Sequence, residues 1–133
     1  MITGSTSKGR ILFWYDVNMR SRPIDYRKLG IHLCALAIIE CVLVFFWRDN
    51  VVLACLFLLA TLVVFLWHGF RRHVVASYIV GFILGPTLEM IVIRSGTWQY
   101  TLPTFGGIPL WLPLLWGLTT AIVVQIAGCF ADA

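Results

Sequence analysis

The chain has 133 residues, of which 60% are hydrophobic and 12% charged, with a mean hydropathy of +0.91 and a formal net charge of +4. Soluble domains are closer to half apolar and about one quarter charged, so the surplus apolar surface here requires lipid rather than a larger core. The length leaves no room for a soluble catalytic domain beside membrane spans, and the small basic excess, concentrated before residue 29, indicates membrane topology rather than nucleic-acid binding.

Residues 1–30 are predicted to form a basic cytoplasmic segment with an interfacial stretch. Residues 11–15 are apolar and aromatic, but five residues are too few to cross a bilayer, and base-rich sequence follows them as far as Lys28. Aromatic residues with basic flanks favour the headgroup boundary, and Pro23 interrupts any helix there. A docking segment for a partner protein is the alternative.

Four apolar runs follow, at residues 31–47, 51–67, 74–93 and 110–128. Each is close to the length of about 20 residues that a transmembrane helix needs. The predicted fold class is therefore all-α, a polytopic membrane protein with four transmembrane helices, and residues 129–133 form a short tail. The turn Arg48-Asp49-Asn50 favours a helical hairpin over one long helix, because burial of its charges in mid-bilayer is costly.

The distribution of Lys and Arg predicts the orientation in the membrane. Six of these residues precede the first run, and Arg71 and Arg72 lie between the second and third runs. The other two loops contribute only Arg48 and Arg94. The positive-inside rule then places both termini in the cytoplasm and the long third loop on the outer side.

The third and fourth runs carry small residues that are spaced four apart. These residues are Ser77, Gly81, Gly85, Gly117 and Ala121. Residues four apart lie on one face of a helix, and small side chains there let another helix approach closely. We therefore predict that these five residues form the packing faces of the third and fourth spans.

Two acids lie inside apolar runs, Glu40 in the first and Glu89 in the third. Ionisable groups within spans are costly and mark functional sites, so both are candidate catalytic residues. If the first and third spans pack together, the two carboxylates share a site in the outer half of the membrane. If they do not, each acid pairs with a hydroxyl or with a basic residue such as Arg48 or Arg94. The sequence leaves both alternatives open.

The loop after the third run is rich in aromatic residues, Gly and Pro. We predict that it forms an ordered cap over the Glu89 end of the bundle, and that Trp98, Tyr100 and Trp111 contact a ligand. Aromatic walls around an acid suit a lipid or isoprenoid ligand. The alternative is an aromatic belt at the membrane interface.

The cysteines and histidines give no metal-binding pattern. The four cysteines form no C-x-x-C, and none of the three histidines has an acid or a thiol at ligand spacing. We therefore expect neither a metal nor a cofactor.

One ordered set of residues carries a resemblance to known proteins: Glu89, Trp98-x-Tyr100 and Gly107-x-Pro109-x-Trp111-x-Pro113. This order resembles the end of uncharacterised small bacterial multi-span membrane proteins, which implies location in a bacterial inner membrane. Over residues 85–117 the chain is also distantly similar to the integral-membrane carotenoid hydratase group. That group has more spans than this chain, and no catalytic residue is carried over from it.

Two functions from different classes are expected. The first is a non-catalytic accessory or scaffold component that packs against the transmembrane helices of a partner protein or of a second copy. The alternative is a small membrane enzyme or a lipid- or isoprenoid-binding protein, with Glu89 and Glu40 beneath the aromatic loop. A transporter or channel is a third, and it requires an oligomer. The expected partners are membrane lipid and another membrane protein or a second copy, but no nucleic acid.

Overall fold

The computed structural model describes residues 24–131, and these form four helices and no strand. The helices are α2 (Tyr26–Phe46), α3 (Asn50–His68), α4 (Arg72–Arg94) and α5 (Leu112–Ala131). Each is long and apolar enough to cross a membrane, which confirms the predicted all-α class with four spans. The predicted interfacial stretch at residues 11–15 lies outside the described residues.

Capping side chains determine where the first two helices begin. Asp25 accepts a hydrogen bond from the backbone N–H of Lys28 and pairs with its ammonium at 3.1 Å, so α2 begins at Tyr26 rather than at residue 31. Asp49 accepts hydrogen bonds from two backbone N–H groups in the first turn of α3. The first two runs are thus a helical hairpin and not one long helix.

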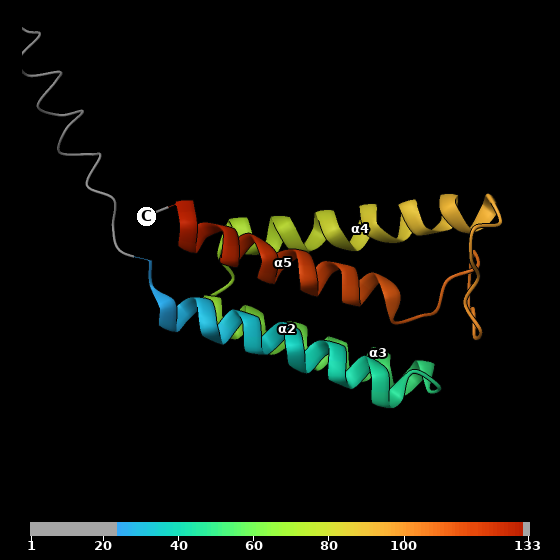
Figure 1. Ribbon diagram of the computed structural model, residues 1–133, viewed down its shortest axis with the longest axis horizontal. Helices are drawn as coiled ribbons and strands as arrows, with labels where there is room; N and C mark the ends of the chain where they lie inside the picture. Colours follow the sequence, from blue (N-terminus) through green and yellow to red (C-terminus); the bar gives the residue numbers. More distant parts are fainter. Residues whose placement is uncertain (1–23, 132–133) are drawn as a thin grey trace, which may run out of the picture.

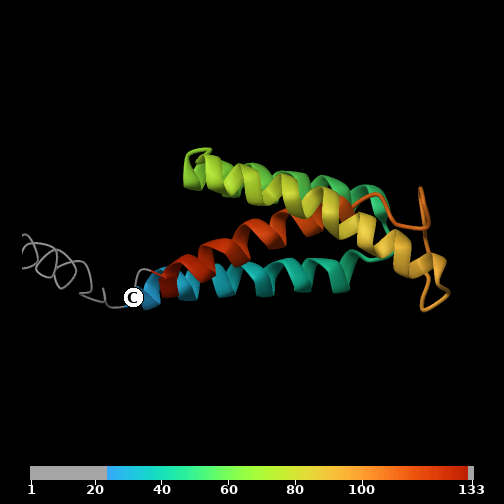
Figure 2. The same ribbon diagram turned by 90° about the horizontal axis from the view of Figure 1, so that it is seen from above.

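The four helices run up and down, so the chain reverses at the two ends of the bundle (Figures 1 and 2). The turn at residues 47–49 and the α4–α5 loop at residues 95–111 lie at the same end, which we call the loop end. α5 contacts all three other helices, and its contact with α4 is the most extensive in the bundle. α2 and α4 are not in contact. α5 is therefore the central element of the fold.

Glycines make the close α4–α5 contact possible. A side chain at Gly81 would collide with Thr120, and one at Gly85 would collide with the indole of Trp116. Both glycines are buried in the interface. The backbone of α4 can therefore approach α5 this closely only because these two positions carry no side chain.

The other three predicted packing residues also lie on α4 and α5. A Cβ on Gly117 would come within 2.8 Å of the Tyr78 ring, and Ala121 is fully buried. Ser77 is half-buried, and its hydroxyl donates a hydrogen bond to the Val74 carbonyl of its own helix at 2.9 Å. The α4–α5 interface is thus based on close packing of small residues, with the Ser77 hydroxyl satisfied within α4.

The α4–α5 loop is folded back onto α4 by a tight turn. Phe105 and Ile108 exchange two backbone hydrogen bonds, and the two residues between them, Gly106 and Gly107, have φ values of 57° and 87°. Positive φ at both central positions is typical of a turn that glycine favours. A side chain at Gly106 would also meet Met90 of α4. The turn directs Ile108, which is fully buried, into the core.

Candidate functional site

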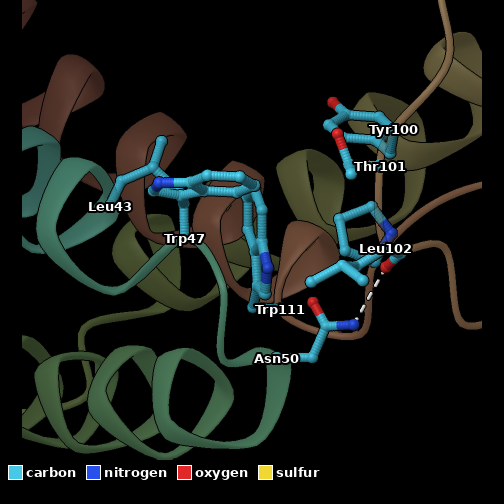
Figure 3. Close-up of a pocket in the computed structure, with 8 residues that line it drawn as sticks. Leu43, Trp47, Asn50, Tyr100, Thr101, Leu102 and Trp111 are labelled. Atoms are coloured by element: carbon cyan, nitrogen blue, oxygen red, sulfur yellow. Dashed lines mark hydrogen bonds between the residues drawn. The ribbon is translucent and has the colours of Figure 1, made fainter.

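A recess of about 240 Å³ lies at the loop end, between α2, the start of α3 and the α4–α5 loop (Figure 3). Its lining residues are Leu43, Trp47, Asn50, Tyr100, Thr101, Leu102, Pro109 and Trp111. The lining is mainly apolar, and it includes no charged side chain. The recess is therefore suited to an uncharged or largely apolar occupant.

Asn50 holds the α4–α5 loop against the α2–α3 hairpin. Its Nδ2 donates hydrogen bonds to the Leu102 carbonyl at 2.9 Å, drawn in Figure 3, and to Thr104 Oγ1 at 3.2 Å. Because a carbonyl can only accept, the contact with Leu102 fixes which end of the amide faces the loop. Asn50 Oδ1 is then buried without a hydrogen-bond partner. The same side chain thus fixes the loop through its Nδ2 and lines the recess.

Trp111 forms a second wall and is only 6% exposed. Its ring packs edge-on against Phe57 of α3 and against Tyr100, with centroid distances of 6.2 and 6.3 Å. Trp111 Nε1 is buried without a hydrogen-bond partner. A buried indole N–H usually has an acceptor, because an unpartnered one costs about 1–3 kcal/mol. Asn50 and Trp111 thus each line the recess and each carry one buried polar atom without a hydrogen-bond partner.

Tyr100 connects the recess with Glu89. Burial, followed by the charge of the neighbouring Glu89 carboxylate and hydrogen bonding to it, raises the pKa of Tyr100 to about 12. Glu89 Oε2 is buried without a partner, but Glu89 does not line the recess. Residues 24–131 contain four buried side-chain N or O atoms without a hydrogen-bond partner. One of them is on Glu89, and two are on residues that line the recess, Asn50 and Trp111. Glu89 thus lies near Tyr100 but outside the recess.

Glu40 is not part of this site. It is exposed on α2, and since α2 and α4 are not in contact, the two carboxylates within the spans do not share a site. The alternative pairing with Arg48 or Arg94 is also wrong, because the only ion pair among residues 24–131 joins Lys28 to Asp25. Hydropathy could not reveal this separation, which arises because α5 occupies the centre of the bundle.

The predicted ligand-binding residues divide between two places. Tyr100 and Trp111 line the recess, whereas Trp98 is 47% exposed and does not. The sequence interpretation missed the contribution of the α2–α3 hairpin, from which Trp47 and Asn50 line the recess. A usable signal was present, because so short a turn places both residues at the same end of the bundle as the α4–α5 loop.

The ionisation of Tyr100 tests its contact with Glu89. Tyr100 should ionise near pH 12 in the wild-type protein, rather than near the usual pH 10, which is seen as a rise in tyrosinate absorbance. A Tyr100→Phe variant identifies this step, because the step is missing from its titration. Because the pKa of the folded state is the higher one, the contribution of Tyr100 to stability is complete below pH 10 and is lost as the pH rises to 12. Glu89→Gln should lower the pKa of Tyr100 part of the way, since burial remains. An ultraviolet difference titration in which Glu89→Gln leaves this pKa unchanged would contradict the contact.

Metal-binding side chains are not clustered in the described part of the chain. No group of three His, Cys, Asp or Glu residues there is placed to hold a metal ion, and the four cysteines are free thiols. Two of the three histidines, His32 and His68, stack at 5.6 Å between centroids. This pair joins the start of α2 to the end of α3, at the end of the bundle opposite the recess.

A comparison of the chain with protein-family models, with curated proteins and with solved structures gave no match in any of the three.

Proposed function

We propose that the protein is a membrane component that binds one end of a lipid in the recess at the loop end. The supporting observation is that aromatic and aliphatic side chains from α2 and the α4–α5 loop, together with Asn50, line a mainly apolar recess at one end of the bundle. An apolar cavity with a few polar groups at its edge is typical of a ligand-binding site. The recess is smaller than the pockets of about 300–1,000 Å³ that enclose whole small molecules, which supports binding of one end only.

The proposed role is binding rather than catalysis. The lining offers one hydroxyl on Thr101 and one phenol on Tyr100, but no carboxylate, imidazole, amine or thiol. Acid–base and nucleophilic catalysis normally require such a group within hydrogen-bond reach of the substrate. Glu89 does not line the recess.

The proposal includes an orientation, with the recess on the outer side of a bacterial inner membrane. Four of the six Lys and Arg residues between residues 24 and 131 lie at the end opposite the recess, and only Arg48 and Arg94 lie at the loop end. Four more basic residues precede residue 24. This bias supports cytoplasmic termini by the positive-inside rule.

A substitution that fills the recess tests the proposal. Leu43→Trp should remove nearly all of a lipid that co-purifies with the gently extracted wild-type protein, as measured by native mass spectrometry. Val44→Trp is the matched control, because this neighbouring side chain is 68% exposed and does not line the recess. Lipid retained in Leu43→Trp, or a wild-type protein without lipid, would count against lipid binding. Melting temperatures of both variants show whether they are folded.

The accessory or scaffold function is a second candidate, and Glu40 favours it. This residue is exposed on α2 six residues before the helix ends, or about 9 Å along the axis. A carboxyl group that faces lipid is costly, and acids within spans almost always face other protein or water. Cys41, the next residue in the chain, is also exposed, and Ile39 is the only buried residue of α2. A helix from a partner protein or from a second copy would shield Glu40 on this face.

A further inference from the structure

The stacked rings of His32 and His68 join the start of α2 to the end of α3. Their centroids are 5.6 Å apart, the angle between their planes is 26°, and both side chains are partly buried. In the part of the chain that the structure describes, no other aromatic contact, side-chain hydrogen bond or ion pair links these two helices. α3 is also held to α4 at this end, because the Phe65 ring packs edge-on against Tyr78 at 5.2 Å. The stack is thus the one directional contact between α2 and α3.

Both rings can take up a further proton. His32 Nδ1 lies 2.7 Å from the Lys28 carbonyl oxygen, and since a carbonyl can only accept, Nδ1 carries the hydrogen of this bond. The basic nitrogen of the neutral His32 ring is then Nε2. Histidine is the side chain whose charge ordinarily changes between pH 5 and pH 8. A fall in pH therefore adds positive charge to the stack itself.

The charged groups near the stack are mostly basic. They are Arg27 and Lys28 of α2, Arg71 of the α3–α4 turn, and Arg72 and His73 of α4. The uncharged ionisable groups at this end are Tyr26, Cys34, Tyr78 and Cys129, the last being the only ionisable residue of α5. Arg71 and His73 lie close enough to His68 for their charges to act on it. Asp25, the one carboxylate at this end among the described residues, is already engaged in the ion pair at the start of α2.

We infer that the His32–His68 stack is a pH-sensitive switch, closed while the rings are neutral and opened when both are protonated. Two positive charges at this separation repel each other in a partly buried site, and the start of α2 relieves the repulsion by moving away from α3. α3 remains packed on α4 through Phe65, so α2 is the helix that moves. With the proposed orientation, this end faces the cytoplasm, and the switch responds to cytoplasmic acidification. The inference does not depend on lipid binding in the recess.

The ordinary basicity of imidazole sets the size of the effect. A solvated imidazole with the reference pKa of about 6.5 favours its protonated form about 30-fold at pH 5. If the closed stack takes up no proton and the open form takes up two, the open form gains about 1,000-fold at this pH. A closed stack that takes up one proton still loses about 30-fold. Either shift is large enough to change which form predominates.

A distance measurement between spin labels on α2 and α3 tests the switch. The labels are attached to cysteines at Ile31 and Trp67, two exposed positions next to the histidines, in the full chain with its four native cysteines replaced by alanine. Pulsed electron paramagnetic resonance in lipid nanodiscs should give a longer distance at pH 5 than at pH 8. Labels at Phe45 and Val51, exposed residues at the loop end, are the control pair and should show no change.

The α2 helix cap does not interfere with this measurement. The hydrogen bond from the Lys28 backbone N–H to Asp25 lowers the pKa of this carboxyl group below its usual value, so the cap stays ionised at pH 5. A change in distance between pH 8 and pH 5 is therefore not caused by loss of the cap.

Glutamine variants identify the rings responsible. His32→Gln and His68→Gln should each abolish the change in distance between pH 8 and pH 5, because the pair can no longer carry two charges. His73→Gln is the matched control, since His73 lies at the same end but outside the stack, and it should keep the change. Similar melting temperatures at pH 8 show that the variants are folded.

Three outcomes would overturn the inference. The first is an Ile31–Trp67 distance that is the same at pH 5 and pH 8 in the chain with both histidines. The second is a change that persists in His32→Gln and in His68→Gln. The third is an equal change at the Phe45–Val51 pair, which would indicate general loosening of the bundle.

Discussion

Gly85→Leu should separate α4 from α5 and unfold the bundle at a much lower temperature than the wild-type protein. Even a Cβ at this position would overlap the Trp116 indole, and α4–α5 is the most extensive contact in the structure. Overpacking alone costs about 1–3 kcal/mol, and here the backbones cannot move apart without losing the rest of the interface. We expect the free energy of unfolding to fall by about 3 kcal/mol or more.

Gly128 on α5 provides the matched control, because nothing lies within 4 Å of a Cβ built there. Gly128→Leu should leave the melting temperature unchanged or raise it slightly, since leucine has a higher helix propensity than glycine. Thermal unfolding in detergent micelles, followed by circular dichroism, measures both variants. Similar melting temperatures for Gly85→Leu and Gly128→Leu would show that close packing at Gly85 does not stabilise the bundle.

Crosslinking through Cys41 should depend strongly on Glu40 if α2 packs against another helix. In a chain that keeps Cys41 as its only cysteine, Glu40→Gln should preserve the crosslinked product, because an amide still donates and accepts hydrogen bonds. Glu40→Leu should reduce the association about tenfold, since a hydrogen bond between transmembrane helices is worth about 1–2 kcal/mol. Oxidation in intact membranes followed by gel electrophoresis measures the product.

The mass of that product identifies the neighbour. A band at twice the mass of the chain indicates a second copy, and any other mass indicates a partner protein. A chain that keeps only Cys55, which is exposed on α3, is the control for random collisions. A product whose yield is the same in Glu40→Leu and the wild type would contradict assembly through this face of α2.

Much of the helical framework could be predicted because it depends on local properties of the chain. Apolar runs of membrane-spanning length predict helices, and Asp49 in a short charged turn predicts a hairpin. Which helices touch is not a local property. The sequence therefore left open whether Glu40 and Glu89 meet, and the structure separates them because α5 lies between the other helices.

The recess was harder to predict because three separate parts of the chain build it. Tyr100 and Trp111 were identifiable as aromatic residues of one loop, but Asn50 was identifiable only as a turn residue. Its role depends on a hydrogen bond to the Leu102 carbonyl, 52 positions away in the sequence. A side-chain amide can bond to many backbone groups, so no local pattern specifies this one.

The central position of α5 has a consequence for how the protein is made. α5 is the last of the four helices to leave the ribosome, yet it is the helix that the other three contact. Until it enters the bilayer, Gly81 and Gly85 of α4 have no helix against which to pack, and the contact between α3 and α4 is small. Nascent chains that stop before Leu112 would therefore expose these faces to lipid, insertion factors or membrane proteases.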